Sequence, residues 1–126
     1  MNFREVNALG SILNHTYGQS VEKQPGSFKV IPKLVGENKM TITCMVVVNL
    51  LDRQHMQKEV EKTYRECKKA CNERLKQIKS DFKNSVGRAL KTKQTGTDDS
   101  VELINMSAYS PKGTALVRCV YEFEVK

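Results

Sequence analysis

Residues 52–93 read DRQHMQKEVEKTYRECKKACNERLKQIKSDFKNSVGRALKTK, and this stretch decides the fold. Its apolar positions recur at steps of three and four residues, which is an eleven-residue repeat averaging about 3.67 residues per turn. Such spacing is typical of an α-helix with a narrow apolar stripe along one side. The stripe comprises Met56, Val60, Tyr64, Cys67, Cys71, Leu75, Ile78, Phe82, Val86 and Ala89. We expect one long helix over 52–93, capped by Asp52.

The length of this helix supports the first functional hypothesis. Forty residues of helix span about 60 Å, whereas strands of eight to eleven residues span roughly 26–37 Å. One sheet would then leave part of the apolar stripe without cover, and uncovered apolar stripes usually mark contacts with other chains. We therefore predict an assembly seam formed by Met56, Val60, Tyr64, Phe82, Val86 and Leu90. The alternative is a helix that breaks at Gly87 or earlier and folds back.

Strands are expected on both sides of the long helix. Before it, residues 28–50 are expected to form a hairpin, in which Pro32 indicates an edge strand. The run MTITCMVVVNL at 40–50 is apolar on both faces towards its end, which indicates a central, well-covered strand. After the long helix, residues 100–125 are expected to form a second hairpin around a turn that contains Pro111.

A shorter helix is expected at the N-terminus. Apolar residues at spacings of three and four extend over 2–17, and Asn2 with Glu5 forms a box-like cap. The expected fold is therefore α+β: an N-terminal helix, then a ββ-α-ββ layout whose four-stranded antiparallel sheet packs on one long helix. Residues 1–126 are expected to form a single domain.

The chain is basic, with 21 Lys and Arg against 14 Asp and Glu, a net charge of +7. Basic residues crowd into the second half of the long helix, beyond what capping of its C-terminus requires. This pattern predicts contact with a polyanion through phosphates or with an acidic protein. The alternative is a solvated face that keeps the helix soluble. The predicted contact residues are Arg74, Lys76, Lys79, Lys83, Arg88, Lys91 and Lys93.

Several classes of function are not expected. No apolar run reaches the roughly 20 residues of a membrane span, and no signal peptide is recognisable. The cysteines are therefore expected to be reduced thiols of a cytoplasmic protein. They sit singly in strands or on the apolar stripe, so we read all four as core residues and expect neither a metal site nor a cofactor. No nucleophile or phosphate-loop motif occurs near His15, His55 or Asp98-Asp99, so we do not expect an enzyme.

The C-terminal part of the chain resembles small proteins of tailed bacteriophages. The resemblance lies in Asp99-Ser100-Val101-Glu102-Leu103-Ile104 and in Tyr109-Ser110-Pro111-Lys112-Gly113-Thr114-Ala115, together with the layout of two hairpins around a charged helix. It implies a virion component of the capsid, neck or tail, located in the virion and in the host cytoplasm during assembly.

Three functions remain open from the sequence. The leading hypothesis is a structural assembly protein that self-associates or docks on other virion proteins. The second is an accessory protein that binds nucleic acid through phosphates, without reading sequence, since no cluster of aromatic residues for base stacking is present. The third is a regulator that binds an acidic protein.

Overall fold

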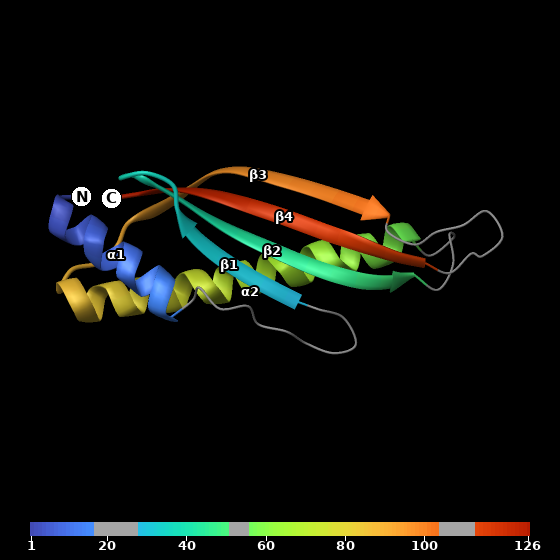
Figure 1. Ribbon diagram of the computed structural model, residues 1–126, viewed down its shortest axis with the longest axis horizontal. Coiled ribbons are helices and arrows are strands. Elements are labelled where there is room, and N and C mark those ends of the chain that lie inside the picture. Colours follow the sequence, from blue (N-terminus) through green and yellow to red (C-terminus); the bar gives the residue numbers. More distant parts are fainter. Residues whose placement is uncertain (17–27, 51–55, 104–112) are drawn as a thin grey trace.

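Two hairpins flank one long helix in the computed structural model, which describes residues 1–16, 28–50, 56–103 and 113–126 (Figure 1). The elements are α1 (Phe3–Thr16), β1 (Phe28–Leu34), β2 (Lys39–Leu50), α2 (Met56–Val86), β3 (Thr92–Leu103) and β4 (Gly113–Val125). The expected α+β class and ββ-α-ββ order are confirmed. The predicted cap Asp52, the Pro111 turn, His55 and Tyr17 lie outside the described residues, as does the side chain of His15.

The four strands form one antiparallel sheet in the order β1-β2-β4-β3. The long strands β2 and β4 pair in the middle, from Lys39 opposite Glu124 to Leu50 opposite Gly113, and so join the two hairpins. Strand β1 forms one edge, as Pro32 predicts, because proline has no N–H to donate to a second neighbour. Strand β3 forms the other edge and is interrupted between Gln94 and Gly96 by a bulge.

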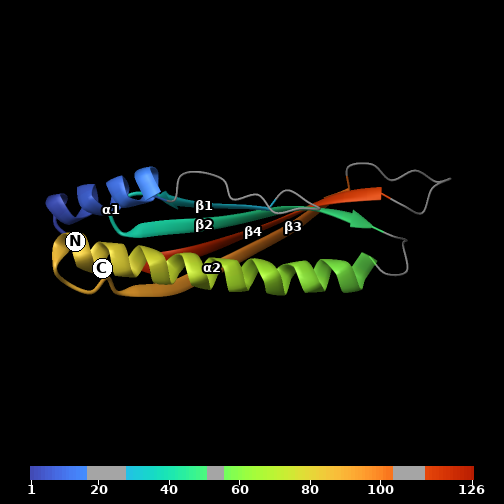
Figure 2. The same ribbon diagram turned by 90° about the horizontal axis from the view of Figure 1, so that it is seen from below.

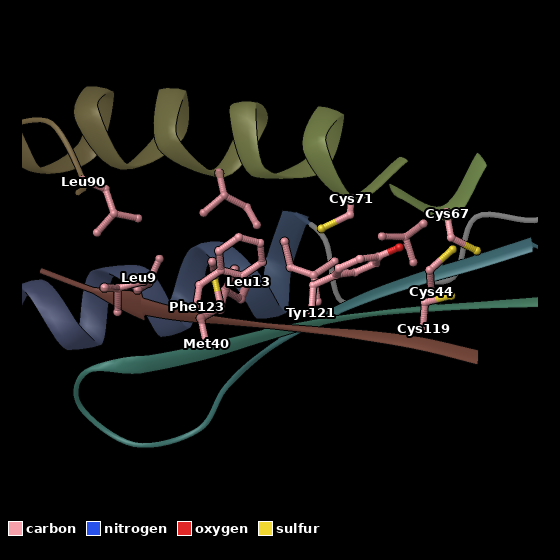
Figure 3. Close-up of a cluster of buried hydrophobic side chains, with 14 of the residues drawn as sticks. Leu9, Leu13, Met40, Cys44, Cys67, Cys71, Leu90, Cys119, Tyr121 and Phe123 are labelled. Atoms are coloured by element: carbon pink, nitrogen blue, oxygen red, sulfur yellow. The ribbon is translucent and has the colours of Figure 1, made fainter. Parts of the chain in front are cut away.

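Helix α2 runs along one side of the sheet, and α1 lies at the end of the molecule where α2 finishes and where both termini are found (Figures 1 and 2). The apolar stripe of α2 faces the strands as predicted: Cys67, Cys71, Ile78 and Phe82 are at most 1% exposed. Leu9 and Leu13 of α1 complete this core beside Met40, Phe123 and Leu90 (Figure 3). We call the side of the sheet that faces α2 the closed face.

The predicted extent of the long helix is wrong at its C-terminal end. Helix α2 stops at Val86, because Gly87 takes a positive φ of 87° that side chains rarely adopt. The N–H of Gly87 donates to the carbonyl of Lys83 at 2.9 Å, a common glycine-ended helix terminus. The chain then enters β3 at Thr92, eight residues before the strand was expected at Ser100.

These new boundaries remove the expected mismatch in length. Helix α2 has 31 residues and spans about 46 Å, while β2, β3 and β4 have 12, 12 and 13 residues and span about 40 Å. The sheet therefore follows α2 over most of its length, and α1 packs beside the remaining end. The expectation of a long bare end of α2 is wrong for this reason.

The N-terminal cap is confirmed. The amide N–H of Glu5 donates to Oδ1 of Asn2 at 2.9 Å, and the amide N–H of Asn2 donates to Oε1 of Glu5 at 3.2 Å. Each side chain thus satisfies one of the amide groups that the first turn of a helix leaves unpaired.

Candidate interaction surfaces

The predicted assembly seam does not form one exposed stripe. Phe82 is fully buried and Leu90 is 3% exposed, so the exposure expected of both residues is wrong. Val86 and Tyr64 are half-buried against the same core, and Val60 is half-buried near the start of α2. The side chain of Met56 lies outside the described residues. The sheet and α1 cover Tyr64, Phe82, Val86 and Leu90, so these members of the predicted seam stabilise the chain itself.

The predicted polyanion residues do not share one helical surface either. Lys91 and Lys93 follow the end of α2, with Lys93 already in β3, so their placement on the helix is wrong. Lys76 and Lys83 are exposed on α2, whereas Lys79 is half-buried. Arg74 is also half-buried, and its guanidinium donates to the side-chain oxygen of Gln77 at 3.3 Å.

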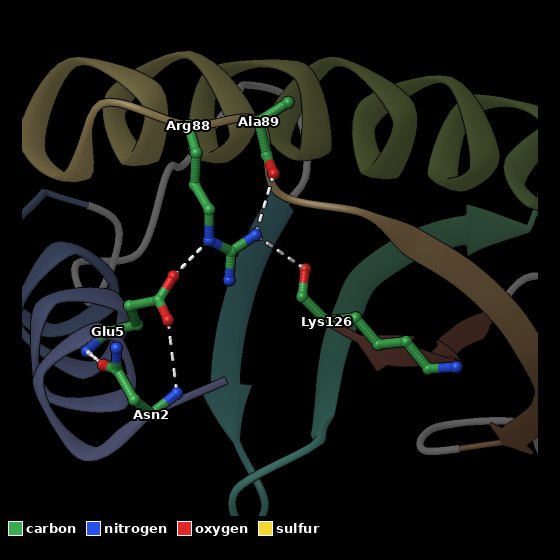
Figure 4. A network of polar contacts seen from close by, with 5 residues as sticks. All are labelled: Asn2, Glu5, Arg88, Ala89 and Lys126. Carbon is green, nitrogen blue, oxygen red and sulfur yellow. Dashed lines mark hydrogen bonds and ion pairs between the residues drawn. The ribbon is translucent and has the colours of Figure 1, made fainter.

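Arg88, the remaining member of that set, holds the end of the molecule together (Figure 4). Its guanidinium pairs with the carboxylate of Glu5 and donates to the carbonyls of Ala89, at 3.0 Å, and of Lys126, at 3.2 Å. It also lies 5.3 Å from the centroid of the Phe82 ring. The hydrogen bond from Arg88, with that from the backbone of Asn2, holds the pKa of Glu5 below its usual range. Arg88 therefore has a role in the fold, and sequence spacing alone could not reveal its distant partners.

The four cysteines are all buried thiols between α2 and the sheet, as predicted (Figure 3). Contact with the Cys119 thiol lowers the pKa of Cys67, but contact with Cys44 and burial outweigh it and raise the value to about 12. Burial also raises the pKa of Cys71 to about 12. The thiols of Cys67 and Cys71 are therefore protonated at neutral pH and poorly suited to nucleophilic chemistry. Within the described residues, no group of three or more His, Cys, Asp or Glu is placed to hold a metal ion.

A basic hollow lies on the surface of α2 that points away from the sheet. Arg65, Lys68, Lys69 and Lys76 line it together with Asn72 and Glu73. Only Lys76 belongs to the set predicted from the sequence. Arg65, Lys68 and Lys69 lie about two to three turns before Lys76, where acidic neighbours in the sequence had obscured the clustering.

The opposite side of the sheet, which we call the open face, is covered by no helix or strand among the described elements. The register brings its outward side chains into rows across the strands. In one row Ile31, Thr43 and Val120 are neighbours, and in the next rows Met45 lies beside Arg118 and Val47 beside Leu116. The central apolar side chains are half-buried by one another and by neighbouring strands: Ile31, Met45, Val47, Leu116 and Val120.

This apolar composition is unusual for a sheet face without a cover. Antiparallel sheets with one solvated face normally alternate apolar residues inwards with polar residues outwards. Here β2 carries Met45 and Val47 outwards as well as Cys44 and Val46 inwards. The run at 40–50 was read as a strand covered on both faces. Its central position is correct, but cover on the open face is absent from the described part of the chain.

The comparisons with other proteins identify no relative. Neither a protein-family model, nor a curated protein, nor a solved structure matches this chain. None of the described helices is long and apolar enough to span a membrane. Function must accordingly be inferred from the surfaces described above.

Proposed function

We propose that this chain is a structural protein that acts by assembling with other protein chains through the open face of its sheet. The observation that supports this function best is the apolar centre of that face, formed by Ile31, Met45, Val47, Leu116 and Val120. A contiguous apolar patch on a water-soluble domain is costly unless another surface covers it, and such patches commonly mark protein contacts.

The border of the patch supports the same function. The charged side chains of Lys29, Lys33, Asp98 and Glu122 surround the apolar centre, and the exposed Arg118 of β4 lies within it, between Leu116 and Val120. An apolar centre with a polar rim is the usual composition of a protein–protein interface. On the closed face, in contrast, α1 and α2 cover the apolar residues of β2 and β4.

The setting we propose for this assembly is a tailed-bacteriophage virion. This part of the proposal rests on the resemblance of the stretches at 99–104 and 109–115 to small phage proteins. A four-stranded sheet with one long helix along one side suits a repeated structural position, because it presents its other, broad face to a neighbouring chain.

Sedimentation of particles from the source cells tests this function. We expect the wild-type chain to sediment with a large assembly, and the double variant Val47→Lys and Leu116→Lys to remain in the light fraction, because two charges would be buried in the contact. The matched control is Ser80→Lys with Asn84→Lys, which adds the same charge at exposed positions of α2 outside the basic hollow and should leave sedimentation unchanged. Circular dichroism verifies that each variant is folded. A folded wild-type chain found only in the light fraction would contradict the proposal.

A second candidate function is phosphate-mediated binding of nucleic acid at the basic hollow of α2. The observation in its favour is the convergence of Arg65, Lys68, Lys69 and Lys76 on one surface. Binding of this kind weakens steeply with salt, by a slope of about 0.9 in log K for each phosphate contact. We expect Arg65→Glu with Lys69→Glu to reduce both the affinity for mixed-sequence duplex DNA and this slope. If the salt dependence of DNA binding were unchanged in the folded variant, binding of nucleic acid at this hollow would be contradicted.

A further inference from the structure

The charges on the open face are separated from one edge to the other. Strand β1 points Lys29 and Lys33 outwards, whereas β3, at the far edge, points Asp98 and Glu102 outwards. Lys93, at the beginning of β3, is the exception, and the register places Glu124 beside it on β4. One edge of the open face is therefore basic and the other is mainly acidic. Between them lie the apolar patch and the exposed Arg118 of β4.

A surface with this arrangement is complementary to a copy of itself. We propose, building on the function proposed above, that the partner on the open face is a second copy of this chain, packed face to face about a two-fold axis parallel to the strands. In this pair β1 of each copy lies over β3 of the other, so the contact between a lysine edge and an acidic edge occurs twice in the dimer. Two-fold pairing of one self-complementary patch is the commonest form of oligomer.

The charges also select this axis over the other possible one. A two-fold axis within the sheet plane but perpendicular to the strands would place β1 over β1 and β3 over β3. Lys29 and Lys33 would then face the same lysines of the second copy, and like charges brought together at an interface oppose association. An axis parallel to the strands avoids both the contact of β1 with β1, which is basic, and the contact of β3 with β3, which is mainly acidic.

The same axis brings apolar side chains together at the centre. Rotation about a line parallel to the strands keeps each residue at its level along the sheet and exchanges β2 with β4. Val47 then lies opposite Leu116 of the second copy and Thr43 opposite Val120, because these residues are register partners within one sheet. In the row between them, Met45 lies opposite the exposed Arg118 of the second copy. Packed sheets cross at about 30°, so this correspondence holds best near the centre.

The available area is sufficient for such a pair. Strands spaced about 4.8 Å apart and about 40 Å long, with the shorter β1, give a flat face of about 700 Å². Specific interfaces of standard size bury about 800 Å² on each partner, counted as accessible surface, which exceeds the flat area. The open face as a whole therefore matches what a stable dimer needs, whereas the apolar centre alone does not.

Exchange of the edge charges tests the pairing with the purified full chain. One variant carries Lys29→Glu and Lys33→Glu, and the other carries Asp98→Lys and Glu102→Lys. We expect the wild-type chain to be a dimer by light scattering and each variant alone to dissociate at least about tenfold more readily, because both of its edges then carry the same sign. An equimolar mixture of the two variants should recover the dimer. A wild-type dimer whose stability neither variant changes would overturn the proposed charge contacts.

Cross-linking tests the axis independently. Lys29 and Ser100 occupy the same row at opposite edges, so a short bis-maleimide should join a Lys29→Cys chain to a Ser100→Cys chain in a mixture. Neither chain should be joined to itself, and the four native thiols are buried. Efficient self-joining of Lys29→Cys would overturn the axis. A strictly monomeric pure chain would overturn the second copy as the partner, while sedimentation with a large assembly in cells would still support the proposed function with a different protein on the open face.

Discussion

The two faces of the sheet have similar strands but different surroundings. On the closed face, Ile42, Val117 and Cys119 are fully buried beneath α2. On the open face, Ile31, Val120 and Leu116 occupy equivalent outward positions on strands of the same sheet and remain half-buried. Apolar residues on both sides of a strand normally indicate cover on both sides. Among the described residues, the helices cover only one of the two faces, and this difference is the reason that we propose a second chain on the open face.

The largest expected effect is the difference in reactivity between the buried thiols of the closed face and a thiol placed on the surface. With a pKa of about 12, Cys71 has a thiolate population on the order of 10³-fold lower than an ordinary thiol of pKa near 8.5. We expect the four native thiols to react with a maleimide only after denaturation. The control is Asn72→Cys, one residue along α2 at an exposed position, which should react at once. Rapid labelling of the native chain without denaturant would show that the closed face opens readily.

Truncation of one isoleucine on each face compares their contributions to stability. Ile42→Ala removes a fully buried side chain beneath α2 and should lower the free energy of unfolding by about 2–5 kcal/mol. Ile31→Ala, at the half-buried position on the open face, should cost clearly less, because part of its surface already contacts water. Urea denaturation of both variants at low protein concentration measures the difference. Equal losses would contradict the distinction between the faces.

Acid should loosen the end where α1 closes the core. Because the pKa of Glu5 is lowered in the folded chain, its pairing with Arg88 stabilises the fold above the unfolded pKa of about 4.3. This contribution is lost as the pH falls through the lower folded pKa. We expect Glu5→Gln to unfold more readily than the wild-type chain at pH 7, and the two chains to become equal in strong acid. A difference in stability between the two chains that does not change with pH would exclude the ion pair as the cause of that difference.

The smallest effect is expected from Gly10→Ala on α1. A Cβ at Gly10 would lie 3.9 Å from Cδ2 of Leu34, an ordinary contact distance, and Gly10 has no unusual φ. Replacing a helical glycine by alanine should stabilise the fold by about 0.5–1 kcal/mol, mainly by restricting the unfolded chain. Thermal unfolding measures the gain. A loss of stability would indicate that α1 approaches β1 more closely than this distance implies.

Periodicity predicted most of the fold, because it is a local property. The stripe from Cys67 to Phe82 identified α2 and the face that it buries. The cap formed by Asn2 and Glu5 located the beginning of α1. The extent of α2 was overestimated because the apolar spacing continues to Leu90, although the chain leaves the helix at Gly87. The spacing of apolar residues is unaffected by a single residue with positive φ, so it could not show that the helix ends at Gly87. The overestimated length of α2 then led to the wrong assembly seam.

The element order, the α+β class and the burial of the cysteines could be predicted from the sequence alone, because these features depend on side chains close together in the chain. The ion pair between Arg88 and Glu5 and the burial of Phe82 and Leu90 in the core became evident only from the folded chain. It also decided that the apolar residues of β2 and β4 line a face without a described cover. Each of these features depends on contacts between residues far apart in sequence. A strand pattern specifies two faces, but only the packing of the helices specifies which of them the described helices cover.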